Sequence, residues 1–303
     1  MNNSILINEV GLRDGLQNQP QLVSTPDKLR LIHALLDAGI KAFEVTSFVS
    51  PKAVPQMADA ADLVRRLPQL PGVTYSALVP NLRGCERALE AGVRSMALVL
   101  AASDTMNRRN INMSFVEALA ESEAMLRFAR SNGVAMRAYV ATAFGCAYEG
   151  HVEPSIVEDL VAQLFLCGAD EVILADTIGV GDPMHVSALV GSLVSRHGAA
   201  TLSVHFHDTK GLALANSYAA FEQGIRKFDA SIGGLGGCPF APGARGNAAT
   251  EDLVNMFEAG GVDTGTNLEK LVEAVGIAES CIGQALGSHW INWRRGRRAQ
   301  RQS

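Results

Sequence analysis

Several features that would place this chain in a special class of protein are missing from its 303 residues. No apolar run approaches the ~18 residues of a membrane-spanning helix, so we expect no membrane association. The first residues carry no basic stretch ahead of an apolar one, so no signal peptide is evident. The five cysteines form no CxxC pair, which favours reduced thiols in a cytoplasmic protein.

Aromatic residues are also scarce, at 6%, whereas 29 glycines are present. This composition excludes a fibrous chain, a disulfide-rich miniprotein and a disordered protein. The net charge is −5, and residues 287–303 hold five arginines and no acid, so the remainder carries −10. An acidic body argues against nucleic acid as a partner. We interpret 1–286 as one catalytic domain and 287–303 as a partly disordered Arg-rich tail, with a patch for nucleic acid or an acidic partner as the alternative for the tail.

Short β-branched runs alternate along the chain with longer segments whose apolar residues recur at helical spacing. We expect eight strands, at 4–8, 42–46, 73–79, 95–100, 135–142, 171–175, 201–206 and 228–232. Eight strand–helix units predict an α/β fold of the (β/α)8 TIM-barrel type. An open, doubly wound sheet uses the same alternation and is the alternative. An extra helix, about 267–286, follows the eighth unit, ahead of the basic tail.

Capping residues mark the ends of two of the expected helices. Thr25 is a candidate N-cap, with Pro26 in the first turn and Gly39 at the exit. Asp182 and Gly198 bound another helix in the same manner.

Polar and ionisable residues follow several of the expected strands. Because side chains alternate along a strand, His205 and His207 point to the same side, which in a barrel is the side of the axis. Asp14 comes directly after the first strand, between Arg13 and Gly15, and can supply an oxygen ligand. Taken singly, the two histidines could equally be a metal pair or ordinary core or surface residues, and the aspartate could cap a turn.

Two further acids belong to expected strands. Glu44 stands between Phe43 and Val45, and because an unpaired buried charge is costly it needs a partner, Arg13 or a histidine. Asp176 ends the sixth strand, where it is either a functional acid or a cap for the following segment.

The segment 233–246 reads GGLGGCPFAPGARG and follows the last strand, where barrels often bind phosphate groups or carry a lid. It contains no nucleotide-binding fingerprint. Cys238 lies in its middle, where a thiol is more accessible than in a core. Asn247 closes the segment, and its side-chain carbonyl could bind a hard cation.

Together these strand ends deliver polar groups to one rim of the barrel. An aspartate, two histidines and an asparagine form a mixed oxygen and nitrogen set, which suits Mg²⁺ or Mn²⁺ better than structural zinc. A zinc hydrolase fits the ligands alone, but barrel hydrolases usually carry the His-x-His pair on the first strand, whereas here it lies on the seventh.

Six segments resemble the metal-dependent barrels that cleave or form a carbon–carbon bond next to an acyl-CoA, and within them the hydroxymethylglutaryl-CoA lyase family. The resemblance runs from about residue 5 to about 285, and its motifs are 9–18, 44–51, 176–181, 205–216, 234–239 and 246–252. The glycine–cysteine segment separates these lyases from the related synthases.

The resemblance implies a role for each candidate residue. Asp14, His205, His207 and Asn247 would bind the metal. Arg13 would be the catalytic cation, Cys238 the loop thiol, and Glu44 and Asp176 supporting acids. His205 or Asp14 could also exchange protons with the substrate.

The implied reaction cleaves 3-hydroxy-3-methylglutaryl-CoA, or a close 3-alkyl analogue, to acetyl-CoA and acetoacetate. The first alternative is a Claisen-type synthase that condenses acetyl-CoA with a 2-oxo acid, although only ~50 residues follow the eighth strand and synthases generally carry a further segment there. The second is a metal-bound barrel that binds acyl-CoA without turnover. An exposed barrel helix is consistent with a homodimer.

Overall fold

All eight expected strands are present in the computed structural model, which describes residues 3–237 and 246–302. Their bounds are β1 Leu6–Glu9, β2 Ala42–Ser47, β3 Thr74–Leu78, β4 Ser95–Ala101, β5 Ala135–Ala141, β6 Glu171–Asp176, β7 Leu202–Phe206 and β8 Lys227–Ala230. Each strand pairs in parallel with the next, and β8 pairs with β1, where Ile7 lies opposite Phe228. The barrel is therefore closed, which confirms the predicted fold and excludes the open sheet.

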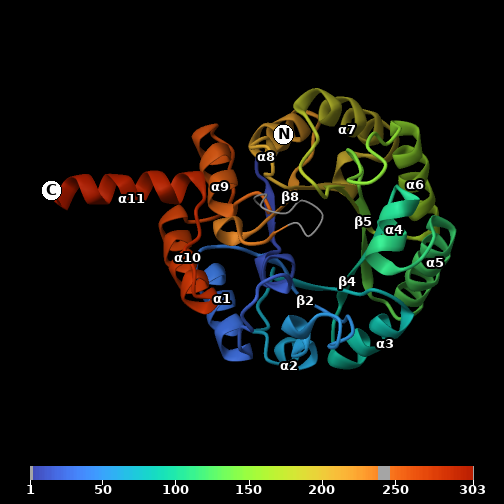
Figure 1. Cartoon of the computed structure of the whole chain (residues 1–303), viewed down its shortest axis with the longest axis horizontal. Coiled ribbons are helices and arrows are strands. Elements are labelled where there is room, and N and C mark those ends of the chain that lie inside the picture. The colour runs from blue at the N-terminus through green and yellow to red at the C-terminus, as the bar shows by residue number, and fades with distance from the viewer. Residues whose placement is uncertain (1–2, 238–245, 303) are drawn as a thin grey trace.

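Helices surround the barrel as an outer ring (Figure 1). They are α1 Thr25–Asp37, α2 Ala60–Arg65, α3 Leu82–Ala91, α4 Asp104–Ile111, α5 Phe115–Ser131, α6 Pro154–Cys167, α7 Pro183–His197, α8 Ala213–Glu222, α9 Thr250–Ala259 and α10 Leu268–Ile282. The last of these is the extra helix expected after the eighth unit, four residues shorter at its C-terminal end than 286. None of the helices in the described ranges is both long and apolar enough to cross a membrane.

The boundaries predicted for two of the helices are confirmed, with one correction to an N-cap. Ser24, not Thr25, is the N-cap of α1, because its hydroxyl accepts the amide hydrogen of Asp27. Thr25 begins the helix and donates its hydroxyl hydrogen to Asp59 instead. Asp182 caps α7 as predicted, accepting from two backbone N–H groups of the first turn, and Gly198 ends that helix.

Side-chain alternation divides the core into two parts. Along β5, Met136, Ala138 and Val140 join the apolar layer between strands and helices, whereas Arg137 and Tyr139 point into the barrel. The apolar cluster inside the barrel is small, comprising Ala97, Tyr139, Ile173 and Ala175. Charged and polar residues therefore fill much of the barrel interior, and they must satisfy one another there.

Much of the Arg-rich segment is helical in the part of the chain that the structure describes. It forms α11, His289–Gln302, which projects away from the barrel in Figure 1. Its first turn is capped by Asp252, which accepts the backbone N–H groups of His289 and Trp290. Ile291 is buried, and Arg295 pairs with Glu279 of α10 at 2.7 Å. These contacts explain why a sequence that is rich in like charges is helical here.

Two glycines at helix ends test how tightly the outer ring is packed. Gly39 after α1 and Gly92 after α3 have φ values of +99° and +98°. A Cβ on Gly39 would lie 2.3 Å from the carbonyl oxygen of Gly265, whereas a Cβ on Gly92 would have nothing within 4 Å. We expect Gly92→Ala to cost about 1–2 kcal/mol, the penalty of the left-handed conformation alone.

Gly39→Ala should cost about 1–3 kcal/mol more than Gly92→Ala, because the added methyl group displaces backbone. Urea unfolding of the two variants measures this difference directly. Equal losses of unfolding free energy in the two variants would show that the backbone near Gly265 moves to accommodate the methyl group without an energetic cost.

Candidate functional site

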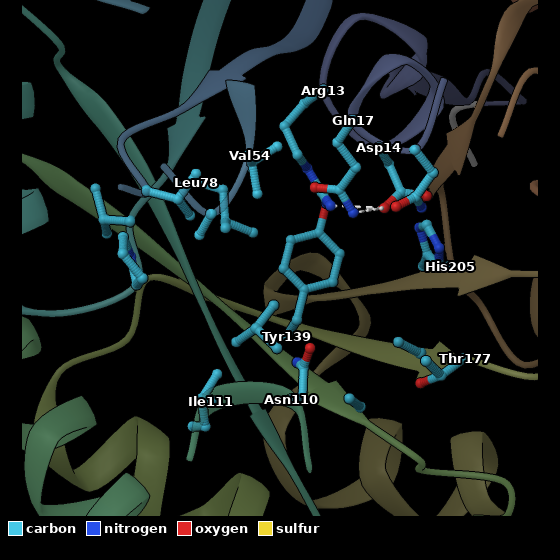
Figure 2. Close-up of a pocket in the computed structure, with 18 of the residues that line it drawn as sticks. Arg13, Asp14, Gln17, Val54, Leu78, Asn110, Ile111, Tyr139, Thr177 and His205 are labelled. Atoms are coloured by element: carbon cyan, nitrogen blue, oxygen red, sulfur yellow. Dashed lines mark hydrogen bonds and ion pairs between the residues drawn. The ribbon is translucent and has the colours of Figure 1, made fainter. Parts of the chain in front are cut away.

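A cavity of about 530 Å³ occupies the carboxyl ends of the strands (Figure 2). One side is polar and includes Arg13, Asp14 and His205. The opposite side is apolar, and its lining comprises Val49, Val54, Leu78, Val99 and Ile111. Figure 2 shows Val54 and Leu78 on the side of the cavity away from Asp14 and His205. The cavity therefore offers charge at one wall and hydrocarbon at the other.

Asp14, His205 and His207 come together at the polar wall, as predicted. Each offers one ligand atom, and these atoms all lie within 4.8 Å of one another. Asp14 belongs to the short helical turn η1, Gly11–Gly15, which follows β1 directly, and His205 belongs to β7. Both imidazoles are buried, with ring centroids 5.2 Å apart. This is a His/His/Asp arrangement with the spacing of a metal site.

Asn247 joins this group from the far side of the glycine-rich segment. It pairs through its backbone with His207, and its Nδ2 donates to Asp14 Oδ2 at 2.8 Å. Its own Oδ1 is buried and has no hydrogen-bond partner among the described residues. An unsatisfied buried acceptor is costly. An amide oxygen of this kind, beside a carboxylate and with Nε2 of His207 3.9 Å from that carboxylate, fits a divalent cation with oxygen and nitrogen ligands.

The protonation states of Asp14 and His207 also favour a metal site. Burial raises the pKa of Asp14, but Arg13 and the two histidines outweigh it and lower that pKa below its usual value. Burial, followed by the charge of His205, lowers the pKa of His207 to about 4. At neutral pH Asp14 is therefore ionised and His207 is neutral, which are the protonation states that bind metal ions.

Glu44 is paired with Arg13, one of the two kinds of partner that the sequence predicted. It is fully buried in β2, and its Oε1 accepts from Nε of Arg13. Its other oxygen accepts from the hydroxyl of Tyr139 at 3.3 Å. The same guanidinium donates through Nη1 to Asp14 at 2.6 Å. Arg13 also lines the cavity. Glu44 thus holds Arg13 at the edge of the cavity.

Asp176 is buried at the end of β6, but it does not line the cavity. Its two carboxylate oxygens accept from the backbone N–H groups of Val180 and Gly181, at 3.0 and 2.9 Å. These contacts are those of a cap for the turn that follows β6. The neighbouring Thr177 does reach the cavity.

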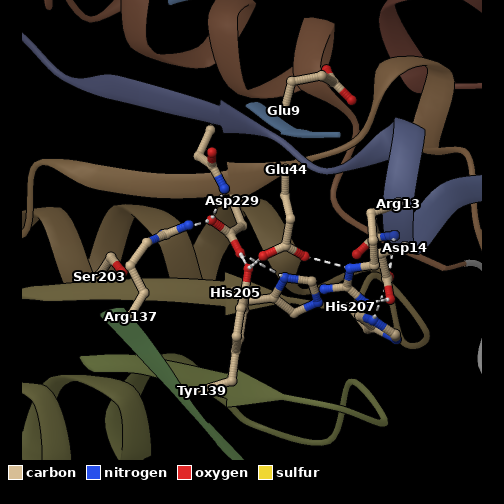
Figure 3. Close-up of polar contacts among 12 residues, drawn as sticks. Glu9, Arg13, Asp14, Glu44, Arg137, Tyr139, Ser203, His205, His207 and Asp229 are labelled. Carbon is tan, nitrogen blue, oxygen red and sulfur yellow. Dashed lines mark hydrogen bonds and ion pairs between the residues drawn. The ribbon is translucent and has the colours of Figure 1, made fainter. Parts of the chain in front are cut away.

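The sequence analysis did not single out three residues that form a network inside the barrel, of which Asp229 and Tyr139 contact His205 (Figure 3). Asp229 Oδ2 lies 3.2 Å from His205 Nδ1 and accepts from the Tyr139 hydroxyl at 2.6 Å. Arg137 donates to the same carboxylate at 3.4 Å. Asp229 stands between Phe228 and Ala230, so it carries the signal that identified Glu44, an acid within an apolar strand.

Glu9, at the end of β1, is a fourth residue that the sequence analysis missed. Its Oε1 accepts from the backbone N–H groups of Gly11 and Ile232, and its Oε2 accepts from the Thr250 hydroxyl. Burial raises its pKa to about 7. One carboxylate therefore connects the turn that carries Arg13 to the two segments that flank residues 238–245.

Cys238 and residues 239–245 lie outside the described residues. The two ends of that segment meet, because a Cβ on Gly246 would lie 2.6 Å from the carbonyl carbon of Gly236. Only glycine permits this approach of backbone to backbone. Asn247 therefore emerges beside Leu235, whose carbonyl oxygen accepts from its Nδ2 at 3.2 Å.

The fold and this site are those of a metal-dependent lyase barrel. The sequence pattern of the HMGL-like family matches residues 4–277, and the chain belongs to that family. It is 46% identical over 270 residues to the mitochondrial hydroxymethylglutaryl-CoA lyase of Macaca fascicularis, covering 89% of this chain and 83% of that protein.

Two further proteins show the same relationship. The 3-hydroxy-3-isohexenylglutaryl-CoA/hydroxy-methylglutaryl-CoA lyase of Pseudomonas aeruginosa is 45% identical over 280 residues, or 92% of this chain and 93% of that one. The HMG-CoA lyase of Acinetobacter baumannii, solved with coenzyme A and 3-methylmalate, superposes with a TM-score of 0.91 at 38% identity. That comparison covers 95% of this chain and 94% of the solved one.

The described cysteines make poor nucleophiles, which leads to a prediction about Cys238. Cys85, Cys146 and Cys281 are buried, and burial raises the pKa of Cys85 to about 12. Burial also raises the pKa of Cys167, which is only partly covered. Because thiolates are the species that react, an alkylating reagent should modify Cys238 first and inhibit the enzyme, and bound acyl-CoA should slow both effects.

Peptide mass mapping after short exposure to iodoacetamide identifies the modified thiol. The Cys238→Ser variant is the control, and it should lose the fast phase of labelling. Modification mainly at Cys85 or Cys281 would contradict this assignment.

Proposed function

We propose that this chain is a hydroxymethylglutaryl-CoA lyase, which converts (S)-3-hydroxy-3-methylglutaryl-CoA to acetyl-CoA and acetoacetate. The observation that carries this function is the convergence of Asp14, His205 and His207 beside a buried arginine that lines the same cavity. Membership of the HMGL-like family supports it.

The reaction is a retro-Claisen cleavage. The tertiary hydroxyl group on C3 loses its proton, the C2–C3 bond breaks, and the electron pair of that bond passes to C2 and the thioester carbonyl. A proton then returns to C2. A bound divalent cation lowers the pKa of a coordinated hydroxyl group and neutralises an oxygen anion.

The chain's own residues supply the rest of the chemistry. We assign Asp14, His205, His207 and Asn247 to the metal. Arg13, fixed by Glu44, stabilises negative charge on the thioester oxygen as the bond breaks.

Two further assignments concern the residue that exchanges protons with the substrate and the residues at the rim of the barrel. We place proton exchange with the hydroxyl group at Asp14 or His205. Asp176 orders the turn beside Thr177, and we assign Cys238 as the reactive thiol of the glycine-rich segment.

The metal that we propose is Mg²⁺ or Mn²⁺. Carboxylate and amide oxygens with imidazole nitrogens suit these ions, and none of the four assigned ligands is a thiolate. The acyl-CoA enters along the apolar wall, which has room for a methyl group or a longer alkyl group on C3. The Acinetobacter baumannii enzyme, which was solved with coenzyme A, supports acyl-CoA as the partner.

We also propose a cytoplasmic homodimer, in which residues 1–286 form the catalytic domain. Four of the five cysteines lie in the described part of the chain as free thiols, as expected in a reducing compartment. Leu166 on α6 and Met184 on α7 are large apolar side chains that are 86% and 75% exposed, which fits an association surface. Light scattering on the purified enzyme measures the oligomeric state.

A coupled acetoacetate assay tests the proposed activity. Incubation with 3-hydroxy-3-methylglutaryl-CoA should release acetoacetate and acetyl-CoA in equal amounts, and longer 3-alkyl esters show how large a group the apolar wall accepts. Acetyl-CoA with a series of 2-oxo acids is the control for a synthase and should release no free CoA. CoA release in the second reaction alone would replace the lyase by a synthase.

Chelation should abolish this activity, because the assigned ligands hold an exchangeable ion. After EDTA treatment and buffer exchange, we expect no turnover until Mg²⁺ or Mn²⁺ is added back. His207→Ala should need a higher concentration of either ion for half-maximal rate, since it loses one ligand. Undiminished activity in protein shown to be metal-free by elemental analysis would remove the metal from the mechanism.

Arg13→Met should fold, retain its metal and bind acyl-CoA, yet turn over at least ~10²-fold more slowly. The interaction of Arg13 with the thioester oxygen strengthens in the transition state, so kcat should fall more than KM rises. Arg13→Lys should restore little, because lysine lacks the planar fork.

The double variant Arg13→Met with Glu44→Gln separates catalysis from charge neutralisation. If Arg13 only neutralised Glu44, the double variant would regain most of the activity. We expect it to regain stability and to remain slow. A stable and fully active Arg13→Met enzyme would contradict the role of Arg13.

A further inference from the structure

Asp229 occupies a fixed place beside His205 because of strand register. In the pairing of β7 with β8, His205 and Asp229 are direct neighbours across the strands. In the pairing of β8 with β1, Asp229 lies opposite Asn8 in the same way. All three residues are buried, and their side chains meet inside the barrel at one level.

Four polar groups surround the carboxylate of Asp229 (Figure 3). Its Oδ1 accepts from Asn8 Nδ2 at 2.8 Å and from Arg137 at 3.4 Å. Its Oδ2 accepts from the Tyr139 hydroxyl at 2.6 Å and lies 3.2 Å from Nδ1 of His205. A carboxylate has about four lone-pair sites, so these contacts saturate it.

This arrangement determines where the proton on the imidazole resides. An ionised carboxylate only accepts hydrogen bonds, and the positive charge of Arg137, 3.4 Å away, favours the ionised form of Asp229. Nδ1 of His205 must therefore be the donor in its contact with Asp229. In the neutral ring the lone pair is then on Nε2, the nitrogen that Asp229 leaves free to act as a ligand.

We propose that Asp229 is a positioning residue for metal binding: it fixes the tautomer and orientation of His205 so that Nε2 is presented to the ion. This inference deepens the proposed function and rests on it, because it concerns the same metal site. His207 has no comparable support, since its Nδ1 has no hydrogen-bond partner among the described residues. Of the two histidines, His205 is therefore the preorganised ligand.

Asp229→Asn is the most informative substitution because it retains the shape of the side chain. Its amide oxygen can still accept from Asn8 and Arg137, which turns its NH2 group toward His205. Nδ1 must then accept, the proton moves to Nε2, and that nitrogen can no longer bind a cation. Loss of such a partner typically weakens metal binding 10–100-fold. We expect the dissociation constant for Mn²⁺, measured by electron paramagnetic resonance, to rise by that factor.

Glu171→Gln is the matched control. Glu171 is also buried and accepts from Arg137 at 2.8 Å and from Lys227 at 2.6 Å, but it has no contact with His205 in the described structure. Its replacement removes one negative charge from the same network. We expect Glu171→Gln to lower the unfolding temperature and to leave the Mn²⁺ dissociation constant within twofold of that of the wild type.

¹⁵N NMR of histidine-labelled, metal-free wild type needs no variant and reads the tautomer directly. At a pH where the rings are neutral, His205 should carry its proton on Nδ1, and in Asp229→Asn on Nε2. A proton on Nε2 in the wild type, or wild-type Mn²⁺ affinity in a folded Asp229→Asn, would overturn the role of Asp229. Failure of the wild type itself to bind Mn²⁺ would instead contradict the metal in the proposed function.

Discussion

A carboxylate inside a barrel is tolerated only when cations and hydrogen-bond donors surround it, because the cost of burying an unpaired charge is several kcal/mol. Two such groups in this barrel, Glu44 and Asp229, share the hydroxyl of Tyr139. Glu44 draws Arg13 inward from the turn after β1, and Asp229 holds His205. The need to compensate these two charges therefore places both the candidate catalytic cation and a candidate metal ligand.

Strand register converts this requirement into a site. Parallel pairing brings residues from β7, β8 and β1 to the same level, so partners that are more than 200 residues apart in sequence become neighbours. The carboxyl ends of the strands then carry Asp14, His207 and Asn247 to one rim. Glu9 connects the backbone segments of that rim through three hydrogen bonds. The site is rigid because the residues that support it belong to strands. The residues that they support lie at or just beyond the carboxyl ends of those strands.

Much of this could be predicted from the sequence. Local periodicity located every strand, and alternation placed His205 and His207 on one side. An acid in an apolar strand identified Glu44 and its need for Arg13. The contacts of Asp229 and Tyr139 could not be predicted, because they depend on register between distant strands. The helix in the Arg-rich segment could not be predicted for a related reason: it depends on contacts with Asp252 and Glu279, which composition does not reveal.

The central claim is that the C2–C3 bond breaks to leave an enolate of acetyl-CoA, which takes its proton from the site. Turnover of 3-hydroxy-3-methylglutaryl-CoA in D₂O, followed by mass spectrometry of the thioester product, measures this step directly. We predict acetyl-CoA with one deuterium in its methyl group. Acetyl-CoA without deuterium would contradict protonation at C2 from a solvent-exchangeable group. Release of free CoA with intact hydroxymethylglutarate would show thioester hydrolysis and contradict the lyase mechanism altogether.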